Sequence, residues 1–408
     1  MLLRVKQAVI LAGGRGTRLA PLTDSLPKPM VEVNGEPFLS HLIRLVASQG
    51  ITEVVILTGY LGNQIHDYFG TGETYGVHIN YSHGPEAWST GERLLAATEL
   101  LDSSFLLLYS DNYVVFDLAS LLAQPGASTA SMVLSVCPKK PGNVIINPDG
   151  SVSRYLRDRS AGYSEFVEVG FSLVSRDHVL AALADSRGSL PGAIELMTQA
   201  GAVLANVIHH PYFSVSDLKR LEQTRLALSH RRVLLLDRDG VINVKAGRGE
   251  YVSQLKDFQP IETNWKALKT LAGRGFTFII ISNQAGVSRG VTHTDELNLI
   301  HAYMTDEMKK IGIEVLAIYV CPHHWDDDCD CRKPKPGMFH TAVADHALLL
   351  SDLIYVGDDI RDEAAAIAAG CTPVIVGPES AFVELRSTAG FLDLAQALPF
   401  IVQHYIVQ

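Results

Sequence analysis

Short apolar runs recur along the chain, and most of them end abruptly at glycine, aspartate, serine or asparagine residues. Runs of this length without alternating polar residues predict strands that are buried on both faces of a parallel sheet. The segments between them have helical spacing of apolar residues and predict covering helices, so we expect an α/β protein. The expected strands are 8–11, 54–58, 105–109, 233–236, 278–281 and 353–356, and the clearest expected helices are 38–49, 64–69 and 217–229.

The length of 408 residues exceeds that of one ordinary domain. A short polar joint at 230–232 separates two series of strands and helices, so we expect two domains, 1–229 and 230–408. A hydrophobic fraction of 47% with 19% charged residues is typical of globular chains. The fold class that we predict is therefore two doubly wound α/β domains.

Composition and charge exclude several classes of function. No apolar run approaches the roughly 20 residues that a membrane span needs, and Arg4 and Lys6 make the first apolar segment a strand rather than a signal peptide. A net charge of -10 without a basic tract argues against binding to nucleic acid. We expect a cytoplasmic protein with small-molecule partners and no membrane contact, and the sequence leaves its oligomeric state open.

The first apolar run breaks into a glycine-rich loop that also contains several cations. Glycines lack side chains, so backbone N–H groups of this loop can approach a polyphosphate. The loop therefore predicts a phosphate-binding site, with a helix opening just beyond it. Its glycines and cations are Gly13, Gly14, Gly16, Arg15, Arg18 and Lys28.

From Gly13 to Met30 this loop resembles the signature of the sugar-phosphate nucleotidyltransferases, GGxGTRLxPLTxxxPKPM. That family has a Rossmann-like domain with a mixed sheet, and it joins a nucleoside triphosphate to a sugar 1-phosphate with release of pyrophosphate. The resemblance implies that Arg15 and Lys28 act in catalysis, with Arg15 and Arg18 on the triphosphate. The other nucleotide-binding residues that it implies are Leu11, Ala12, Gly13, Gly14, Gly16 and Thr17.

The same resemblance assigns a metal ligand and two sugar contacts. Asp111 follows the run 105–109, where the family has an aspartate that binds magnesium; an Asx turn after a strand is the alternative. Segment 169–173 resembles the sugar-binding strand of the family. Glu168 and Gly170 are therefore the implied substrate-binding residues.

Two segments depart from the family pattern. Trp88 stands in segment 87–91, where the family commonly has Leu-Gly-Thr-Ala-Gly near the nucleobase. Ser214 occupies the position of an aspartate that is a second metal ligand in the family. The first domain therefore uses Asp111 alone, recruits the nearby Asp217, or binds without catalysing. Ser216 is the expected cap of the helix 217–229.

The apolar run 233–236 ends in two carboxylates, Asp237 and Asp239. Buried acids cost several kcal/mol unless a cation or donor satisfies them, so this pair indicates a metal or a charged substrate. A strand followed by an Asp-Gly turn is the simpler alternative. Because the carboxyl ends of parallel strands meet at one sheet edge, we expect Ser282, Lys333 and Asp358 to lie at the same edge.

These four motifs, in this order, resemble the haloacid dehalogenase superfamily, whose core is a parallel sheet. The resemblance implies that Asp237 attacks phosphorus and that Asp239 protonates the leaving oxygen and then activates water. Ser282 and Lys333 would hold the phosphoryl group. Magnesium would bind Asp237, Asp358 and the backbone carbonyl of Asp239. The further substrate-binding residues are Asn283, Arg289 and Arg332.

Three of the five cysteines lie within eleven residues, which is metal-site spacing. Together with one imidazole they make a Cys3His set, closed by four ligands and therefore structural. Cys137 and Cys371 are expected core residues. The expected zinc ligands are Cys321, His323, Cys329 and Cys331; His324 is the alternative imidazole, and the family pattern favours His323.

The cysteine loop and the segments 282–290 and 331–338 narrow the resemblance to heptose bisphosphate phosphatases, with histidinol phosphatases in the same branch. Asp359 departs from the basic residue that the family often has there. The two resemblances imply a bifunctional enzyme that uses Mg²⁺ in both domains. It would remove the 7-phosphate from D-glycero-D-manno-heptose 1,7-bisphosphate and then activate the heptose 1-phosphate, with GTP as the expected donor. The alternatives are a phosphatase with a sugar-nucleotide-sensing first domain, and the same two activities on another sugar phosphate or histidinol phosphate.

Overall fold

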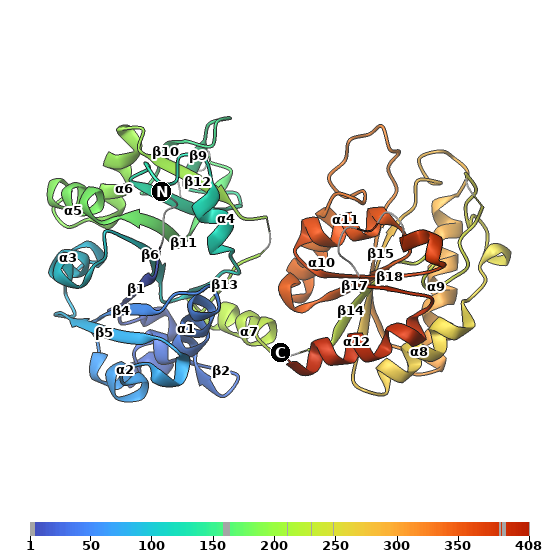
Figure 1. Cartoon of the computed structure of the whole chain (residues 1–408), viewed down its shortest axis with the longest axis horizontal. Helices are drawn as coiled ribbons and strands as arrows, with labels where there is room; N and C mark the ends of the chain where they lie inside the picture. Colours follow the sequence, from blue (N-terminus) through green and yellow to red (C-terminus); the bar gives the residue numbers. More distant parts are fainter. Residues whose placement is uncertain are drawn as a thin grey trace. The chain divides into compact units, whose positions relative to one another are not determined.

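The computed structural model describes residues 5–157, 164–209, 211–229, 231–247, 249–382, 385 and 389–407. The chain divides into two compact units, Met1–Leu228 and Ser229–Gln408, coloured blue to green and yellow to red in Figure 1. Each unit has its own sheet and its own core.

A nine-stranded mixed sheet forms the centre of the first unit. Its strands are β1 (Gln7–Ala12), β4 (Glu53–Thr58), β5 (His78–His83), β6 (Ser104–Tyr109), β8 (Met132–Pro138), β9 (Val144–Ile146), β10 (Val152–Tyr155), β11 (Phe166–Ser175) and β12 (Val203–Val207). The strands β6, β1, β4 and β5 are parallel neighbours in this order, and β11 joins β6 in the antiparallel direction. Two short ribbons complete the unit: β2 (Glu32–Val33) with β3 (Glu36–Pro37), and β7 (Asn112–Tyr113) with β13 (Phe213–Ser214).

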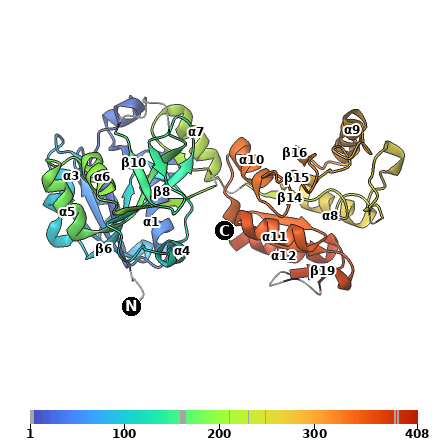
Figure 2. The same cartoon turned by 90° about the horizontal axis from the view of Figure 1, so that it is seen from above.

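Helices cover both faces of this sheet because alternate residues of its central strand are buried on opposite sides. Ala8 and Ile10 belong to one core, and Val9 and Leu11 belong to the other. The helices of the first core are α1 (Phe38–Ser48), α2 (Gly62–Phe69), α4 (Leu118–Ala123) and α7 (Leu218–Ala227). Those of the second core are α3 (Thr90–Ala96), α5 (Arg176–Asp185) and α6 (Leu190–Gln199), which Figure 2 shows together on one side.

Two local predictions for this unit are wrong. The glycine-rich loop leads into three short 3₁₀ turns, Thr17–Leu19, Leu22–Asp24 and Lys28–Met30, instead of an α-helix. Prolines at 21, 27 and 29 remove the backbone N–H groups that a continuous helix would need. At α7 the N-cap is Asp217, whose carboxylate accepts a hydrogen bond from the backbone N–H of Arg220 at 2.9 Å, and not Ser216.

A six-stranded parallel sheet forms the centre of the second unit. In spatial order its strands are β16 (Val315–Cys321), β15 (Thr277–Asn283), β14 (Val233–Leu236), β17 (Ile354–Gly357), β18 (Thr372–Val376) and β19 (Ala389–Phe391). Leu234 and Leu236 enter one core, and Val233 and Leu235 enter the other. Figure 1 shows helices on both sides of these strands. The first core packs α8 (Glu262–Ala272), α9 (Thr294–Lys310) and α12 (Leu394–Val407), and the second packs α10 (Gly337–His346) and α11 (Ile360–Ala369).

The predicted α/β fold class is confirmed in both units. In each of them the polar residues of interest follow the carboxyl ends of the central strands, where ligands bind in open α/β sheets. Within the described residues, no helix has the length and apolar character required to cross a membrane.

Candidate active sites and metal centre

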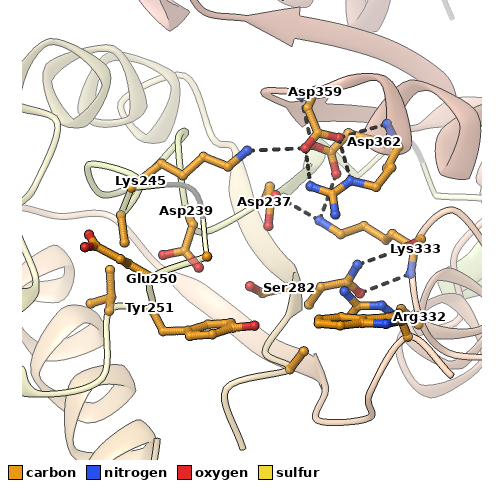
Figure 3. A pocket seen from close by; sticks show the side chains of 18 of the residues that line it. Asp237, Asp239, Lys245, Glu250, Tyr251, Ser282, Arg332, Lys333, Asp359 and Asp362 are labelled. Carbon is orange, nitrogen blue, oxygen red and sulfur yellow. Dashed lines mark hydrogen bonds and ion pairs between the residues drawn. The ribbon is translucent and has the colours of Figure 1, made fainter. Parts of the chain in front are cut away.

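The carboxyl ends of β14 and β15 open into a pocket of about 710 Å³ in the second unit (Figure 3). Asp237 follows β14, and Ser282 lies near the end of β15. Lys245, Glu250 and Tyr251 line one side of the pocket, and Lys333 and Arg332 line the other. The remaining polar lining residues are Asp239, Asn283, Arg289, Trp325, Asp359, Arg361 and Asp362.

Lys333 is the cation at the centre of this pocket, and its side chain is only 3% exposed. Its ammonium lies 2.9 Å from Asp237 Oδ2 and 2.8 Å from Asp362 Oδ1. The hydroxyl of Tyr355 lies 2.7 Å from the same Nζ atom, and the carbonyl oxygen of Ile281 accepts from it at 3.1 Å. Four oxygen atoms therefore surround this buried ammonium, and one of them belongs to the Asp237 carboxylate.

Three carboxylates, those of Asp237, Asp358 and Asp362, offer oxygen atoms that lie within 4.8 Å of one another. Burial raises the pKa of Asp237 to about 8, and its two acidic neighbours add to this effect while Lys333 opposes it. Burial and Asp362 raise the pKa of Asp358 to about 6. Among the described residues, no hydrogen-bond partner reaches the buried Oδ1 atom of Asp358. An excess of negative charge and an unsatisfied oxygen fit a divalent cation with oxygen ligands.

The side chain of Asp239 points to a different set of partners. Arg238, which is fully buried, donates to both carboxylate oxygens of Asp239, the shortest contact being 2.8 Å. Asn243 and Gln284 each donate to it at 2.8 Å. Burial alone would raise the pKa of Asp239, but Arg238 and these two hydrogen bonds outweigh it and lower that pKa. Asp239 is therefore an ionised carboxylate, and its side chain lies outside the three-carboxylate group.

Two predicted phosphate contacts are engaged with the protein itself. The Ser282 hydroxyl accepts from Gln284 Nε2 at 2.8 Å. The Asn283 amide bonds to the backbone of Lys333 on both sides, as acceptor at 3.0 Å and as donor at 3.1 Å. Asn283 thus ties β15 to the segment that carries Lys333.

Cations gather at the outer part of the pocket. Lys245 lies 2.6 Å from Asp358 and 3.3 Å from Asp359, and Arg361 also pairs with Asp359. The negative charge at Asp359, where the sequence departs from the expected basic residue, is therefore offset by two cations. Arg289 lies over the rings of Tyr251 and Trp325, at 5.7 and 5.3 Å from their centroids. Arg332 donates to the backbone oxygen of His323 at 3.4 Å, so it borders both the pocket and the cysteine loop.

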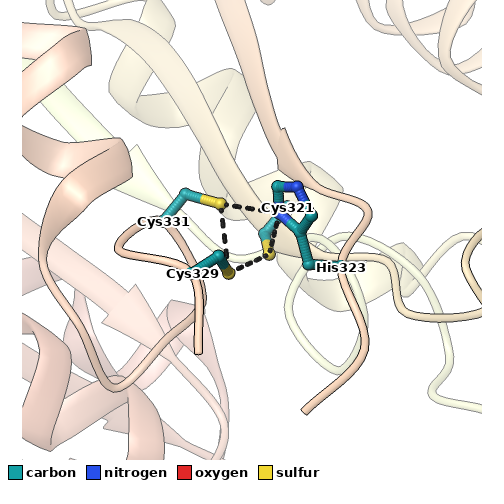
Figure 4. A group of neighbouring side chains, drawn as sticks. All are labelled: Cys321, His323, Cys329 and Cys331. Carbon is teal, nitrogen blue, oxygen red and sulfur yellow. Dashed lines mark hydrogen bonds between the residues drawn. The ribbon is translucent and has the colours of Figure 1, made fainter. Parts of the chain in front are cut away.

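The predicted zinc ligands form one compact group (Figure 4). Cys321 Sγ lies 3.7 Å from both His323 Nδ1 and Cys329 Sγ, and Cys331 Sγ lies 3.2 Å from His323 Nδ1 and 3.5 Å from Cys329 Sγ. Three thiols and one imidazole suit tetrahedral zinc. The alternative imidazole, His324, turns its Nδ1 toward Asp326 at 3.2 Å. Cys137 and Cys371 lie in the cores as expected.

In the first unit, the loop after β1 and the end of β6 line a cavity of about 290 Å³. Lys28 Nζ lies 2.5 Å from Asp111 Oδ2, which brings a catalytic candidate and the metal-ligand candidate together. Gly16 has φ 72°, and a Cβ atom there would lie 2.7 Å from Lys28 Cβ, so glycine is required for this close approach. The cavity is lined by Leu11, Gly13, Gly14, Lys28, Glu86, Trp88, Thr90, Arg93, Tyr109, Ser110 and Asp111.

The predicted triphosphate cations lie outside this lining. Arg15 is half exposed, lies 3.6 Å from Glu86 and stacks over Tyr60 at 4.9 Å. Arg18 and Thr17 are exposed in the first 3₁₀ turn, and Ala12 is buried at the end of β1. The structure brings Gly13, Gly14, Lys28 and Asp111 to the cavity, and Arg15 to its rim through Glu86.

Arg93, which the sequence reasoning missed, lines this cavity and holds the segments around it. It is 4% exposed and donates to the carbonyl oxygens of Thr58 at 2.6 Å and Pro85 at 2.7 Å. A Cβ atom on Gly13 would lie 2.2 Å from its Nε atom, so the glycine lets the loop pack on the guanidinium. Trp88 lies in the segment that Arg93 holds, and its side chain lines the cavity.

The predicted sugar contacts are not open to the cavity. Glu168 is buried in β11 and accepts a hydrogen bond from the Tyr155 hydroxyl at 3.0 Å. Gly170 has φ 74°, in a region where the register between β11 and β8 shifts, and its backbone packs against the Tyr109 ring. These two residues shape the wall behind Tyr109.

Comparison with known proteins matches a different family to each of the two units. Residues 7–144 match the family described as nucleotidyl transferase, and residues 232–368 match the family described as polynucleotide kinase 3 phosphatase. A D-glycero-β-D-manno-heptose-1,7-bisphosphate 7-phosphatase from Pseudomonas aeruginosa is 40% identical over 146 residues, which are 36% of this chain and 81% of that protein. The chain belongs to this phosphatase family. A member from Haemophilus ducreyi is 36% identical over 182 residues, 42% of this chain and 98% of its own.

The phosphatase is joined to a nucleotidyltransferase domain, as predicted. A Bacillus anthracis structure described as a glucose-1-phosphate thymidylyltransferase covers 54% of this chain and 93% of its own, with 18% identity and a TM-score of 0.50. At this identity the likeness concerns the fold alone. The bifunctional organisation of the enzyme rests on the two family matches, which fall in different units.

Two features of the phosphatase site escaped the sequence reasoning. Asp362 stands four residues after Asp358, in the first turn of α11, and Asp358 directly precedes the N-cap residue Asp359. Its carboxylate accepts from the backbone N–H groups of Asp358 and Asp359 at 3.0 and 3.2 Å. Tyr355 lies within an apolar strand, where nothing in the pattern separates a phenol with a polar task from a packing residue.

Proposed function

We propose that the second unit hydrolyses the 7-phosphate of D-glycero-D-manno-heptose 1,7-bisphosphate and that the first unit transfers a nucleotidyl group to the resulting heptose 1-phosphate. The observation that carries the proposed hydrolysis is the contact of Asp237 with buried Lys333 at the carboxyl end of a parallel sheet. GTP is the donor that we expect. The product of one unit would be the substrate of the other.

In the hydrolysis, an Asp237 carboxylate oxygen attacks phosphorus, an aspartyl-phosphate forms, and the bond to the sugar oxygen breaks. Lys333 offsets the charge on the phosphoryl oxygens. Asp239 donates a proton to the leaving oxygen, then removes a proton from the water that cleaves the aspartyl-phosphate, and so ends each cycle protonated. A phosphate group entering beside Asp239 would raise its pKa and so favour the protonated form needed at the start.

Asp237 and Asp358 would hold Mg²⁺ together with the backbone carbonyl of Asp239, and the structure adds Asp362 to the candidate ligands. Bound there, the ion would neutralise charge on the phosphoryl oxygens. The unsatisfied Asp358 Oδ1 atom supports this assignment.

Four further cations, Lys245, Arg289, Arg332 and Arg361, line the same pocket. They suit a substrate with a second phosphate better than one with a neutral or cationic end, such as histidinol phosphate. Competing hydrolysis of heptose 1,7-bisphosphate, hexose bisphosphates and histidinol phosphate would test this preference. Faster turnover of histidinol phosphate would refute the heptose assignment.

For nucleotidyl transfer, an oxygen of the sugar 1-phosphate attacks the α-phosphorus of the triphosphate, and pyrophosphate leaves as the α–β bond breaks. Lys28 would stabilise the transferring phosphates, and Arg15 and Arg18 would neutralise the triphosphate. Asp111 would hold Mg²⁺ together with phosphate oxygens, since this ion often uses only one or two carboxylates.

Pyrophosphate release is the direct test of the proposed nucleotidyl transfer. The purified protein would be incubated with heptose 1-phosphate, Mg²⁺ and each nucleoside triphosphate in turn, and we expect turnover with GTP. Turnover with another triphosphate would correct the base. Binding of nucleotide-sugar without turnover of any triphosphate would favour the sensor function that Trp88 and Ser214 suggest.

We expect His323→Ala to lose zinc, whereas His324→Ala retains one zinc per chain. Among the described residues, His323 supplies the only imidazole of the three-cysteine group, and a structural zinc site contributes its binding energy to folding. We therefore expect His323→Ala to lower the stability of the second unit by at least about 3 kcal/mol. Metal analysis and thermal unfolding of both variants measure this. Equal zinc content in the two variants would refute the ligand assignment.

We expect Tyr355→Phe to lower kcat of the phosphatase by about tenfold with little change in KM, because it removes one of four oxygen partners of Lys333. The ring and its packing on Phe339 are retained. Tyr405→Phe is a matched control, since that hydroxyl serves the backbone of Val233 and Ile354. Equal losses of kcat in the two variants would mean that the Tyr355 effect is general destabilisation.

A further inference from the structure

A second, smaller cavity of about 100 Å³ lies beside Asp111 in the first unit. It is lined by Lys139, Tyr212, Phe213, Ser214, Arg220 and Gln223, and none of these residues is acidic. The ribbon of β7 and β13 places it there. Ser214 pairs with Asn112, and the backbone N–H of Val215 donates to the carbonyl oxygen of Asp111 at 2.9 Å.

Arg220 reaches this cavity from the first turn of α7. Its Nη1 atom lies 3.4 Å from Ser214 Oγ and 3.2 Å from Ser216 Oγ, and both serines are buried. Its Nε atom lies 3.6 Å from Asp217 Oδ2, a long and exposed ion pair. Neutral hydroxyls do not cancel the charge of a guanidinium, so Arg220 keeps much of its capacity to bind an anion.

Lys139 is the second cation of the cavity. Its ammonium lies 3.5 Å from the Tyr212 hydroxyl and 5.4 Å from the centroid of that ring. Like the serines beside Arg220, the Tyr212 phenol is a neutral partner. Two cations and neutral donors, with no carboxylate among the described lining residues, make the cavity selective for an anion, and its volume suits a phosphate group rather than a nucleotide.

We propose that Lys139 and Arg220 form a subsite for the phosphate of a sugar 1-phosphate, next to Asp111. The subsite deepens the proposed nucleotidyl transfer and rests on it. A phosphate monoester held here would have its charge offset by two side chains and would lie beside the residue assigned to the triphosphate metal. Ser214 is essential to this arrangement, because an acid at that position would pair with Arg220 and occupy its guanidinium.

Arg220→Gln and Ser214→Asp test the subsite independently, because the first removes the cation and the second pairs it with a carboxylate. Both would be made in the Asp237→Asn background, so that the measured activity belongs to the first unit alone. With saturating triphosphate, we expect each to raise KM for heptose 1-phosphate about tenfold or more. In Arg220→Gln, which adds no metal ligand, KM for the triphosphate should change less than about twofold. Arg220→Lys should retain most of the affinity. Lys140→Gln is the control, since Lys140 pairs with Glu165 outside the cavity.

An unchanged KM for heptose 1-phosphate in Arg220→Gln would overturn the subsite. So would an equal rise of both KM values, which would place Arg220 on the triphosphate or in the fold. Thermal unfolding of each variant separates loss of structure from loss of binding. If the parent protein releases no pyrophosphate with any triphosphate, the proposed transfer fails. Calorimetric titration with heptose 1-phosphate then still decides on the subsite, which unchanged affinity in Arg220→Gln would refute.

Discussion

Replacing Asp237 by Asn is expected to abolish phosphate release from heptose 1,7-bisphosphate while pyrophosphate release from the first unit continues. An amide oxygen cannot act as the nucleophile, so the loss in kcat should exceed about 10³-fold. The substitution retains the shape of the side chain. It also removes a buried carboxyl group whose ionisation is unfavourable, since burial and two neighbouring acids raise the pKa of Asp237 to about 8. We therefore expect the variant to fold at least as stably as the parent.

The measurement is the release of inorganic phosphate and of pyrophosphate by the same preparation. Asp359→Asn serves as the control, since Asp359 caps α11 and pairs with Lys245 and Arg361 without contacting Lys333. Loss of both activities in Asp237→Asn would show that the two sites depend on each other. Retained phosphate release would exclude Asp237 as the nucleophile.

The strands that position these sites could be predicted because burial on both faces leaves a plain signal. The run at 233–236 sends alternate residues into two separate cores and therefore tolerates no polar side chain until Asp237. The strand ends then place Asp237 and Ser282 at one pocket by geometry alone. The Cys3His group could also be predicted, because closely spaced thiols have few uses other than metal binding in such a chain.

The sequence could not show the features of the sites that depend on which hydrogen-bond partner each polar side chain has in the folded protein. Asp239 has a carboxylate like Asp237, yet Arg238 turns it away from the three-acid group, and nothing in the spacing distinguishes the two. Arg93 lies far from Gly13 in the chain, and its buried guanidinium is held by the carbonyl oxygens of Thr58, at the end of β4, and of Pro85. Arg220 lies beside Ser214 because the first turn of α7 brings its side chain back to β13, a contact that depends on how the helix packs and not on its sequence pattern.

Replacing Asp111 by Asn is expected to have the converse effect. Pyrophosphate release should fall by about 10² to 10³-fold, and phosphate release by the second unit should be unchanged. Asp111 is the partner of Lys28 at 2.5 Å, and Glu86 is the only other carboxylate among the described residues that line this cavity. If one carboxylate holds the metal, its loss cannot be compensated by Ser214, whose hydroxyl faces Arg220.

Metal dependence makes this prediction specific. In Asp111→Asn, a higher Mg²⁺ concentration should restore part of the activity if the residue is a ligand, whereas a role limited to orienting Lys28 would leave the loss independent of Mg²⁺. Asp217→Asn separates the remaining alternative. Asp217 accepts from the backbone of Arg220 and caps α7, and Asn caps helices about as well, so this replacement should leave both stability and the Mg²⁺ dependence nearly unchanged. A strong shift in Mg²⁺ dependence for Asp217→Asn, together with a weak effect of Asp111→Asn, would identify Asp217 as the metal ligand in place of Asp111.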